Sequence, residues 1–386
     1  MPSDGDPATI ARTTSLGTTM TSDQDLGEMD TEEDDFSFPP AERKVVTQPV
    51  DLSVSTLADQ WKDNILILPE IQREYVWDRG KASRLIESLL LNIPIPVLYF
   101  AETEQARYEI FDGHQRIKSI IDYLNGLFAL SGLAVLREYK GKRFSQLPER
   151  EQRFVKMRTL RTVVISIDSH PNMKFEIYEC LNTGSISLNA QELRNSIYRG
   201  PFNEMLHVLA RLPTYRQLIG TKVPRKRMVD EEAILRFFVF RDRIGSYKTP
   251  LKKFLNDYFS TMKGVASEQI AEYSAIFDTA VSRASHLLGL SAFRLLDPDG
   301  FPSEASVNRS LLVAQLLACS WIADDSAPDP AGVRTSIAAL FGNDTFNDSI
   351  QRATGDRART LQRVRDTVTA LRQAGAQVDV PHNLQA

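Results

Sequence analysis

The chain has 386 residues, of which 42% are hydrophobic and 25% charged, and its formal net charge is -4. This length allows a large core and two domains. No apolar run reaches about 18 residues, so we expect no membrane-spanning helix. The start of the sequence lacks a secretory signal pattern. Its two cysteines, Cys180 and Cys319, exclude a disulfide framework and a cysteine-rich zinc site, and they suit a reducing cytoplasm.

Charge is unevenly distributed along the chain. Residues 1–46 contain 11 acidic and 3 basic residues, and they are rich in Ser, Thr, Gly and Asp. We expect this segment to be a disordered acidic tail. The remaining residues carry 43 basic against 39 acidic side chains, a net charge of +4. A mildly basic body permits contact with nucleic acid but does not require it.

The first ordered elements are expected from about Val45 onward. Asp78 can cap a helix whose apolar residues follow at helical spacing, and Asn92 ends that helix. Residues 96–100 and 107–111 are predicted to be neighbouring strands of a hairpin.

Further along the chain, residues 162–167 are β-branched and predict a buried strand. A helix is expected at 173–181. Asn189 and Glu192 have the spacing of a capping box, so another helix should begin beside them. Beyond residue 200 the apolar pattern is helical throughout, most clearly at 232–240, 251–259, 270–288, 306–322 and 356–374.

Together these patterns predict an α+β protein with two ordered domains. The α+β domain is expected at 47–200 and an all-α domain at 201–375, followed by a flexible tail at 376–386. We see no internal repeat.

Residues 111–116, Phe-Asp-Gly-His-Gln-Arg, are the most informative segment. They lie between a predicted strand and a predicted amphipathic helix. The N-terminus of a helix attracts anions, Gly113 allows close approach of a ligand, and Arg116 can form a fork on phosphate oxygens. Asp112 would then hold a metal ion, position a water molecule or contact a sugar hydroxyl.

A simpler interpretation of the same turn is that Asp112 only caps the helix and that Arg116 is a surface residue. From the residues alone this interpretation is favoured, because an Asp-Gly turn before a helix is common.

Two other segments could contribute to a phosphate site. Gln72 and Arg73 precede Trp77, and an arginine near aromatic residues can pair with phosphate. Asn182 opens a polar turn after the predicted helix at 173–181, and residues 189–195 follow it. Read singly, a loop anchored by Trp77 and a plain connection between helices are the favoured interpretations. A helix-turn-helix interpretation of the third segment is disfavoured because its second helix is not notably basic.

Two basic runs are candidates for contact with a nucleic-acid backbone. Residues 137–161 contain nine Lys or Arg and three Glu. The second run consists of Lys222, Arg225, Lys226 and Arg227. For both runs a solvated surface is the default interpretation.

Several common site patterns are missing from the sequence. It has no Walker-A motif and no H-E-x-x-H motif. The histidines show neither the spacing of a zinc site nor that of a His-Asn-His nuclease; they are residues 114, 170, 207, 286 and 382.

Three segments taken together resemble the N-terminal domain of GmrSD-type restriction endonucleases. They are residues 69–77, 112–116 and 175–184, the last continued by 188–195. They occur in the order and with the spacing of that family. One segment would be weak evidence, whereas three in order make the resemblance fairly specific.

The resemblance implies a fold similar to ParB and sulfiredoxin, with a nucleotide site around an Asp-Gly-Gln-Gln-Arg motif. In this sequence Asp112, Gly113, Gln115 and Arg116 match that motif. His114 stands where the family most often has Gln, and it can still donate or accept a hydrogen bond. The resemblance implies that Asp112, Gln115 and Arg116 are catalytic and that Gly113 and His114 contact the nucleotide.

The resemblance also implies roles for the other segments. Arg73 and Arg116 would bind phosphates, with Gln72 beside them, and Asn182 would contact the ligand from the third segment. Asp112 would hold Mg²⁺ or orient the attacking water. The expected ligand is a nucleoside triphosphate with its Mg²⁺.

Full-length members of this family carry a nuclease domain that contains histidines, and residues 201–386 show no such pattern. We therefore expect a cytoplasmic, NTP-hydrolysing regulator or sensor of a restriction or anti-phage system that acts on DNA. Any nuclease would lie on a partner chain, and a homo-oligomer is compatible with the resemblance. The alternative is a non-enzymatic DNA-binding or partner-controlling module of a two-gene toxin-like system. A nuclease acting through Asp112 itself is a third and less favoured interpretation.

Overall fold

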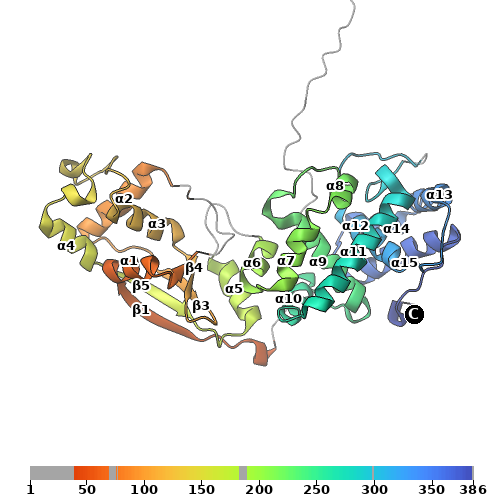
Figure 1. Cartoon of the computed structure of the whole chain (residues 1–386), viewed down its shortest axis with the longest axis horizontal. Coiled ribbons are helices and arrows are strands. Elements are labelled where there is room, and N and C mark those ends of the chain that lie inside the picture. The colour runs from red at the N-terminus through yellow and green to blue at the C-terminus, as the bar shows by residue number, and fades with distance from the viewer. Residues whose placement is uncertain (1–38, 69–74, 76, 182–188, 298–299, 385–386) are drawn as a thin grey trace, which may run out of the picture.

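A mixed five-stranded sheet organises the first part of the chain (Figure 1). The structure is a computed structural model, and it describes residues 39–68, 75, 77–181, 189–297 and 300–384. The spatial order of the strands is β1-β5-β3-β4-β2. The pairs β1/β5 and β3/β4 are antiparallel, and the pairs β3/β5 and β2/β4 are parallel. The strands are β1 (Thr47–Ser53), β2 (Leu66–Ile67), β3 (Leu98–Glu102), β4 (Tyr108–Asp112) and β5 (Thr159–Ile165).

Four helices cover one face of this sheet (Figure 1): α1 (Val54–Lys62), α2 (Arg79–Leu91), α3 (His114–Leu124) and α4 (Glu149–Met157). Alternate residues of the strands point toward these helices, because successive side chains of a strand face opposite sides. Leu98 and Phe100 of β3 are fully buried there together with Ile86, Ile117 and Ile120. Asp78 caps α2 by accepting a hydrogen bond from Lys81 N at 2.7 Å, as the sequence predicts.

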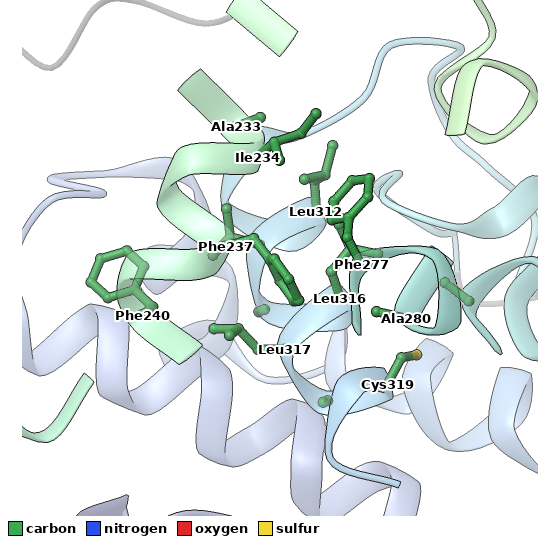
Figure 2. Packing of buried hydrophobic residues seen from close by; sticks show 14 of the residues in the cluster. Ala233, Ile234, Phe237, Phe240, Phe277, Ala280, Leu312, Leu316, Leu317 and Cys319 are labelled. Atoms are coloured by element: carbon green, nitrogen blue, oxygen red, sulfur yellow. The ribbon is translucent and has the colours of Figure 1, made fainter. Parts of the chain in front are cut away.

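The second part of the chain is helical. Within the described residues beyond 200 it contains no strand, only two isolated bridges. Phe237 of α9, Phe277 of α11 and Leu316 of α12 pack together in its core (Figure 2). The helices are α7 (Pro201–Leu209), α8 (Pro213–Ile219), α9 (Val229–Arg243), α10 (Leu251–Thr261), α11 (Ser267–Leu288), α12 (Arg309–Ser320), α13 (Pro330–Leu340), α14 (Asp344–Gln351) and α15 (Arg357–Gln373). The predicted α+β organisation is thereby confirmed.

The structure of the two chain ends differs in part from the predicted disordered and flexible tails. Residues 39–46 belong to the predicted acidic tail, yet Glu42 accepts a hydrogen bond from Asn172 Nδ2 at 2.9 Å and pairs with Lys253 at 3.0 Å. The rest of that tail, 1–38, lies outside the described residues. The predicted flexible tail at 376–386 is wrong for its described part. Val378 is 4% exposed, and Leu384 is buried as well, because both side chains are apolar and cover the helical core.

Two helices lie between the sheet and the helical part (Figure 1): α5 (Pro171–Leu181) and α6 (Ala190–Ile197). The predicted capping box of α6 is present, since Asn189 Oδ1 accepts from Glu192 N at 2.8 Å and Glu192 Oε2 accepts from Asn189 N at 2.7 Å. On α5, Glu176 pairs with Lys252 of α10 at 2.9 Å.

Most of α6 is buried although it is polar. Arg194 is 1% exposed. Its Nε donates to Asn256 Oδ1 of α10 at 2.7 Å, and its Nη1 donates to Glu232 Oε2 of α9 at 3.3 Å. Glu232 also pairs with Arg236 at 2.8 Å and with Arg309 at 3.4 Å. A buried guanidinium is tolerated only with such partners, so this network fixes α6 against the helical part.

A second polar contact of α6 involves His207 of α7. Its Nε2 lies 2.7 Å from Asn195 Oδ1, and its Nδ1 lies 3.2 Å from Glu231 Oε1 of α9. The sheet itself is joined to the chain beyond α6 by ion pairs of Glu109 with Arg199 and of Glu104 with Lys263.

No helix among the described residues is long and apolar enough to span a membrane. Both cysteines are free thiols; Cys180 on α5 is exposed and Cys319 on α12 is buried (Figure 2).

The thiols should therefore react differently. Burial raises the pKa of Cys319 to about 12, and the thiolate is the reactive form. In the native protein we expect one thiol per chain to react with a disulfide reagent at pH 8, and two after denaturation. Cys180→Ser should abolish the native signal. Rapid reaction of both thiols in the native protein would contradict the packing of α12.

Glu232→Gln should destabilise the protein at pH 7 by about 3–5 kcal/mol, because three guanidinium groups lose their carboxylate. Burial alone would raise the Glu232 pKa, but the charges of Arg236, Arg194 and Arg309 outweigh it and lower the pKa from 4.5 to about 2. This stabilisation is present above the unfolded pKa and is lost as the pH falls toward 2.

The difference between wild type and Glu232→Gln should thus shrink in urea denaturation between pH 4.5 and pH 2. Glu272→Gln, at an exposed position of α11, is the matched control and should leave stability nearly unchanged. Equal stability of wild type and Glu232→Gln at pH 7 would show that the network is dispensable.

Candidate functional site

The turn at 111–116 connects β4 to α3 through Gly113. Gly113 is the N-cap of α3 with a φ of +99°, a conformation that L side chains rarely adopt. A Cβ atom at this position would collide with Leu98 Cδ2 of β3. Glycine is therefore required here for two independent reasons, and the backbone at the start of α3 carries no N-cap side chain.

Asp112 and Arg116 form an ion pair one helical turn apart. Arg116 Nη2 donates to Asp112 Oδ2 at 2.5 Å, and Nη1 donates to the carbonyl oxygens of Pro96 and Val97, the latter at 3.4 Å. The Arg116 side chain is 12% exposed, whereas that of Asp112 is 45% exposed. The guanidinium thus anchors the turn to the start of β3, and the carboxylate is the partner that solvent can reach.

These contacts exclude the simpler interpretation of the turn. The N-cap is Gly113 rather than Asp112, and no side chain caps α3 from that position. Arg116 is largely buried rather than a surface residue. Asp112 does not cap α3 because its carboxylate accepts a hydrogen bond from the guanidinium of Arg116.

Gln115 connects the turn to the first segment. Its Oε1 accepts from Trp77 N at 3.3 Å, and its Nε2 lies 2.7 Å from His114 Nε2. Because the amide oxygen is used by Trp77, the amide nitrogen must donate to the ring. His114 Nε2 is then the acceptor, and the proton of the neutral ring lies on Nδ1.

A second contact between these segments runs through Ser119, which is fully buried on α3. Ser119 Oγ donates to Gln115 O at 2.6 Å, so Tyr75 OH, which is 2.9 Å away, donates to Ser119 Oγ. Ser119 lies on the other side of α3 from the apolar stripe formed by Ile117, Ile120 and Ile121, so the local pattern gives no signal for its burial. Gln72 and Arg73, predicted to contact nucleotide, lie outside the described residues.

The third segment reaches the same end of β4. Tyr178 of α5 is buried with its ring against that of Phe111. Burial, together with the nearby Glu109 carboxylate, raises the Tyr178 pKa well above its usual range, so the hydroxyl stays protonated. The predicted ligand contact Asn182 lies outside the described residues. Residues 189–195 make their described side-chain hydrogen bonds at the junction with the helical part rather than to the turn at 111–116.

The four basic residues at 222–227 serve different purposes. Arg225 N donates to Asp230 Oδ2 at 2.7 Å, and Arg227 pairs with Glu192 at 3.3 Å. Lys222 and Lys226 are exposed. Arg227 is exposed as well, and contact of this run with nucleic acid stays a prediction.

The described residues contain no group of three or more His, Cys, Asp or Glu side chains that could hold a metal ion. Asp112 therefore offers a single, solvent-accessible carboxylate. Mg²⁺ commonly binds through one or two carboxylates, with substrate phosphates and water completing its shell. The predicted metal contact of Asp112 fits a cation that arrives with a triphosphate.

Residues 54–199 match the family model described as the N-terminal domain of the GmrSD restriction endonuclease. The match includes β2 to β5 and α1 to α6, and hence the whole turn at 111–116. No curated protein and no solved structure matches the chain. Similarity to ParB and sulfiredoxin thus remains what the resemblance implies.

Gly113→Ala should destabilise the first part of the chain by roughly 1–3 kcal/mol, because it combines an unfavourable φ with a collision against Leu98. Thermal unfolding of the variant measures this loss. Gly126→Ala is a matched control, since its φ is also positive but no atom lies within 4 Å of its Cβ position. A smaller loss for Gly113→Ala than for Gly126→Ala would refute the close approach to β3.

Proposed function

We propose, from the match of residues 54–199 to the family model of the GmrSD restriction endonuclease N-terminal domain, that the chain is a nucleotide-binding component of a restriction or anti-phage system. In this proposal it binds a nucleoside triphosphate at the turn 111–116, hydrolyses it, and acts on DNA in the cytoplasm. The cutting activity resides on a partner nuclease.

The observation that carries the proposal is the contact between two segments far apart in the sequence. Trp77 N binds Gln115, and Tyr75 binds Ser119. The motif thus contacts the described residues of the first segment, Tyr75 and Trp77. These hydrogen bonds fix the two segments relative to each other, as a site with a few precisely placed polar groups requires.

Each residue of the motif has a proposed role that its geometry supports. Gly113 leaves the N-terminus of α3 open to a phosphate group, which the helix dipole attracts. Arg116 adds positive charge beside that end and holds Asp112 in place. Asp112, whose carboxylate solvent can reach, would position water or contact the cation, and bound Mg²⁺ would neutralise phosphate charge. Gln115 and His114 would contact the nucleotide together with Arg73 and Asn182.

Hydrolysis in such a site relies on positioning and electrostatics rather than on covalent chemistry. Asp112→Asn keeps the size of the side chain but removes its charge. We expect it to lower turnover of NTP by at least tenfold, while binding of nucleotide changes less. Steady-state phosphate release and fluorescent-nucleotide titration measure the two effects. Asp59→Asn on α1, also exposed, is the matched control.

Arg116→Ala should weaken both binding and turnover, because phosphate attraction and the anchor of Asp112 are lost together. Background binding of every nucleotide by wild type and both variants would sink the proposal. In that case salt-dependent DNA binding without an effect of nucleotide would favour the non-enzymatic DNA-binding or partner-controlling module.

A further inference from the structure

The nucleotide proposal makes no use of the opposite end of the first part of the chain, the surface formed by residues 137–158. We name it the α4 surface. It contains the short helices η2 (Arg137–Tyr139) and η3 (Phe144–Gln146) and the helix α4. In Figure 1, α4 lies at the end of the molecule that is remote from α5, α6 and the helical part. The α4 surface has eight Lys or Arg residues and three Glu residues.

Several of these cations have no carboxylate partner. Within the described part of the chain, Arg137, Lys140, Arg150 and Lys156 are exposed and form no ion pair. Arg153 pairs with Glu149 at 3.3 Å, but the two side chains are 69% and 86% exposed, so the pair is weak. Elsewhere, arginines such as Arg194 are neutralised by buried carboxyl groups. The α4 surface therefore keeps its positive charge available.

The exposed side of α4 also carries apolar side chains that hold guanidinium groups in place. Phe154 is 40% exposed and Met157 is 74% exposed, while Val155 is the buried residue of this helix. The Cζ atoms of Arg150 and Arg158 lie 5.1 Å and 5.7 Å from the centre of the Phe154 ring. Cation–π contacts at these distances restrict the rotamers of both arginines, which lowers the entropy lost on binding an anion.

We propose that the α4 surface binds the phosphate backbone of double-stranded DNA. The choice of DNA rests on the proposed function, whereas the binding of phosphate groups is argued from the charge and geometry of the surface. The nine residues of α4 span about 13 Å, which corresponds to about four base-pair steps measured along the axis of a duplex. The exposed charged side chains of this surface are mainly Lys and Arg, on a short helix and its flanking turns. Such contacts position a protein on DNA without reading its sequence.

The test compares two double variants that each remove two positive charges. Arg150→Ala/Lys156→Ala alters the α4 surface, and Lys248→Ala/Arg352→Ala alters exposed positions of the helical part. Binding of the full chain to a labelled duplex is measured by fluorescence anisotropy at several salt concentrations. The first variant should bind more weakly, with a salt slope of log K lower in magnitude by about two. The second should behave like wild type.

Two further variants make the outcome specific. Phe154→Ala removes the ring that holds Arg150 and Arg158, so it should weaken binding. Because it retains every charge, the salt slope should stay near that of wild type. Lys222→Ala/Lys226→Ala tests the other predicted contact. Loss of the salt slope in that variant, with the α4 variant unchanged, would overturn the proposal, as would equal losses in the α4 variant and the Lys248/Arg352 control.

Failure of this inference can be told from failure of the proposed function. Nucleotide titration of Arg150→Ala/Lys156→Ala should match wild type, since the substituted residues are on α4 and not at the turn 111–116. If wild type binds nucleotide but not the duplex at any salt concentration, the DNA surface is refuted while the nucleotide site stands. If wild type binds the duplex but no nucleotide, the nucleotide site is refuted while the DNA surface stands.

Discussion

A guanidinium group in the interior of a protein must be paired, and the pairing of Arg194 with Glu232 determines how the rest of this molecule fits together. Arg194 is on α6, whereas Glu232 is on α9, so the ion pair crosses the junction between the α+β part and the helical part. Removing either partner would leave an uncompensated buried charge, which is far more costly than losing an exposed ion pair. The junction is therefore defined by a polar contact with fixed geometry.

This constraint reaches the turn at 111–116 through packing. Tyr178 of α5 packs against Phe111 at the end of β4, and Leu193 of α6 belongs to the same buried group. Glu109 of β4 pairs with Arg199 just beyond α6. A shift of β4 that followed a change at Asp112 would thus disturb contacts on α5 and α6. Those helices are in turn fixed to α9 and α10, so the geometry provides a physical route by which the turn and the helical part can influence each other.

The sequence predicts those parts of the fold whose signals are local. The capping box of Asn189, the cap at Asp78 and the period of α11 each depend on residues a few positions apart, and the structure contains all three. β1 was not predicted, because it is largely exposed, contains Pro49 and has only two apolar residues at alternate positions, Val50 and Leu52. Such a strand exists only because β5 supplies its hydrogen-bond partners. Likewise α4 buries Val155 alone, and in the sequence it is merely a basic run.

The candidate site shows the same division. The glycine and the helix after it are local features, so the place of the turn was predictable. The state of Arg116 was not, because its carbonyl partners on Pro96 and Val97 come from another strand. Conversely, Arg150 of α4 forms no ion pair in the described structure, and Arg153 pairs only with the exposed Glu149. The same residue type thus anchors a turn in one place and leaves a charged surface in another. Which of these an arginine does depends on the carboxyl and carbonyl groups that the fold brings to it.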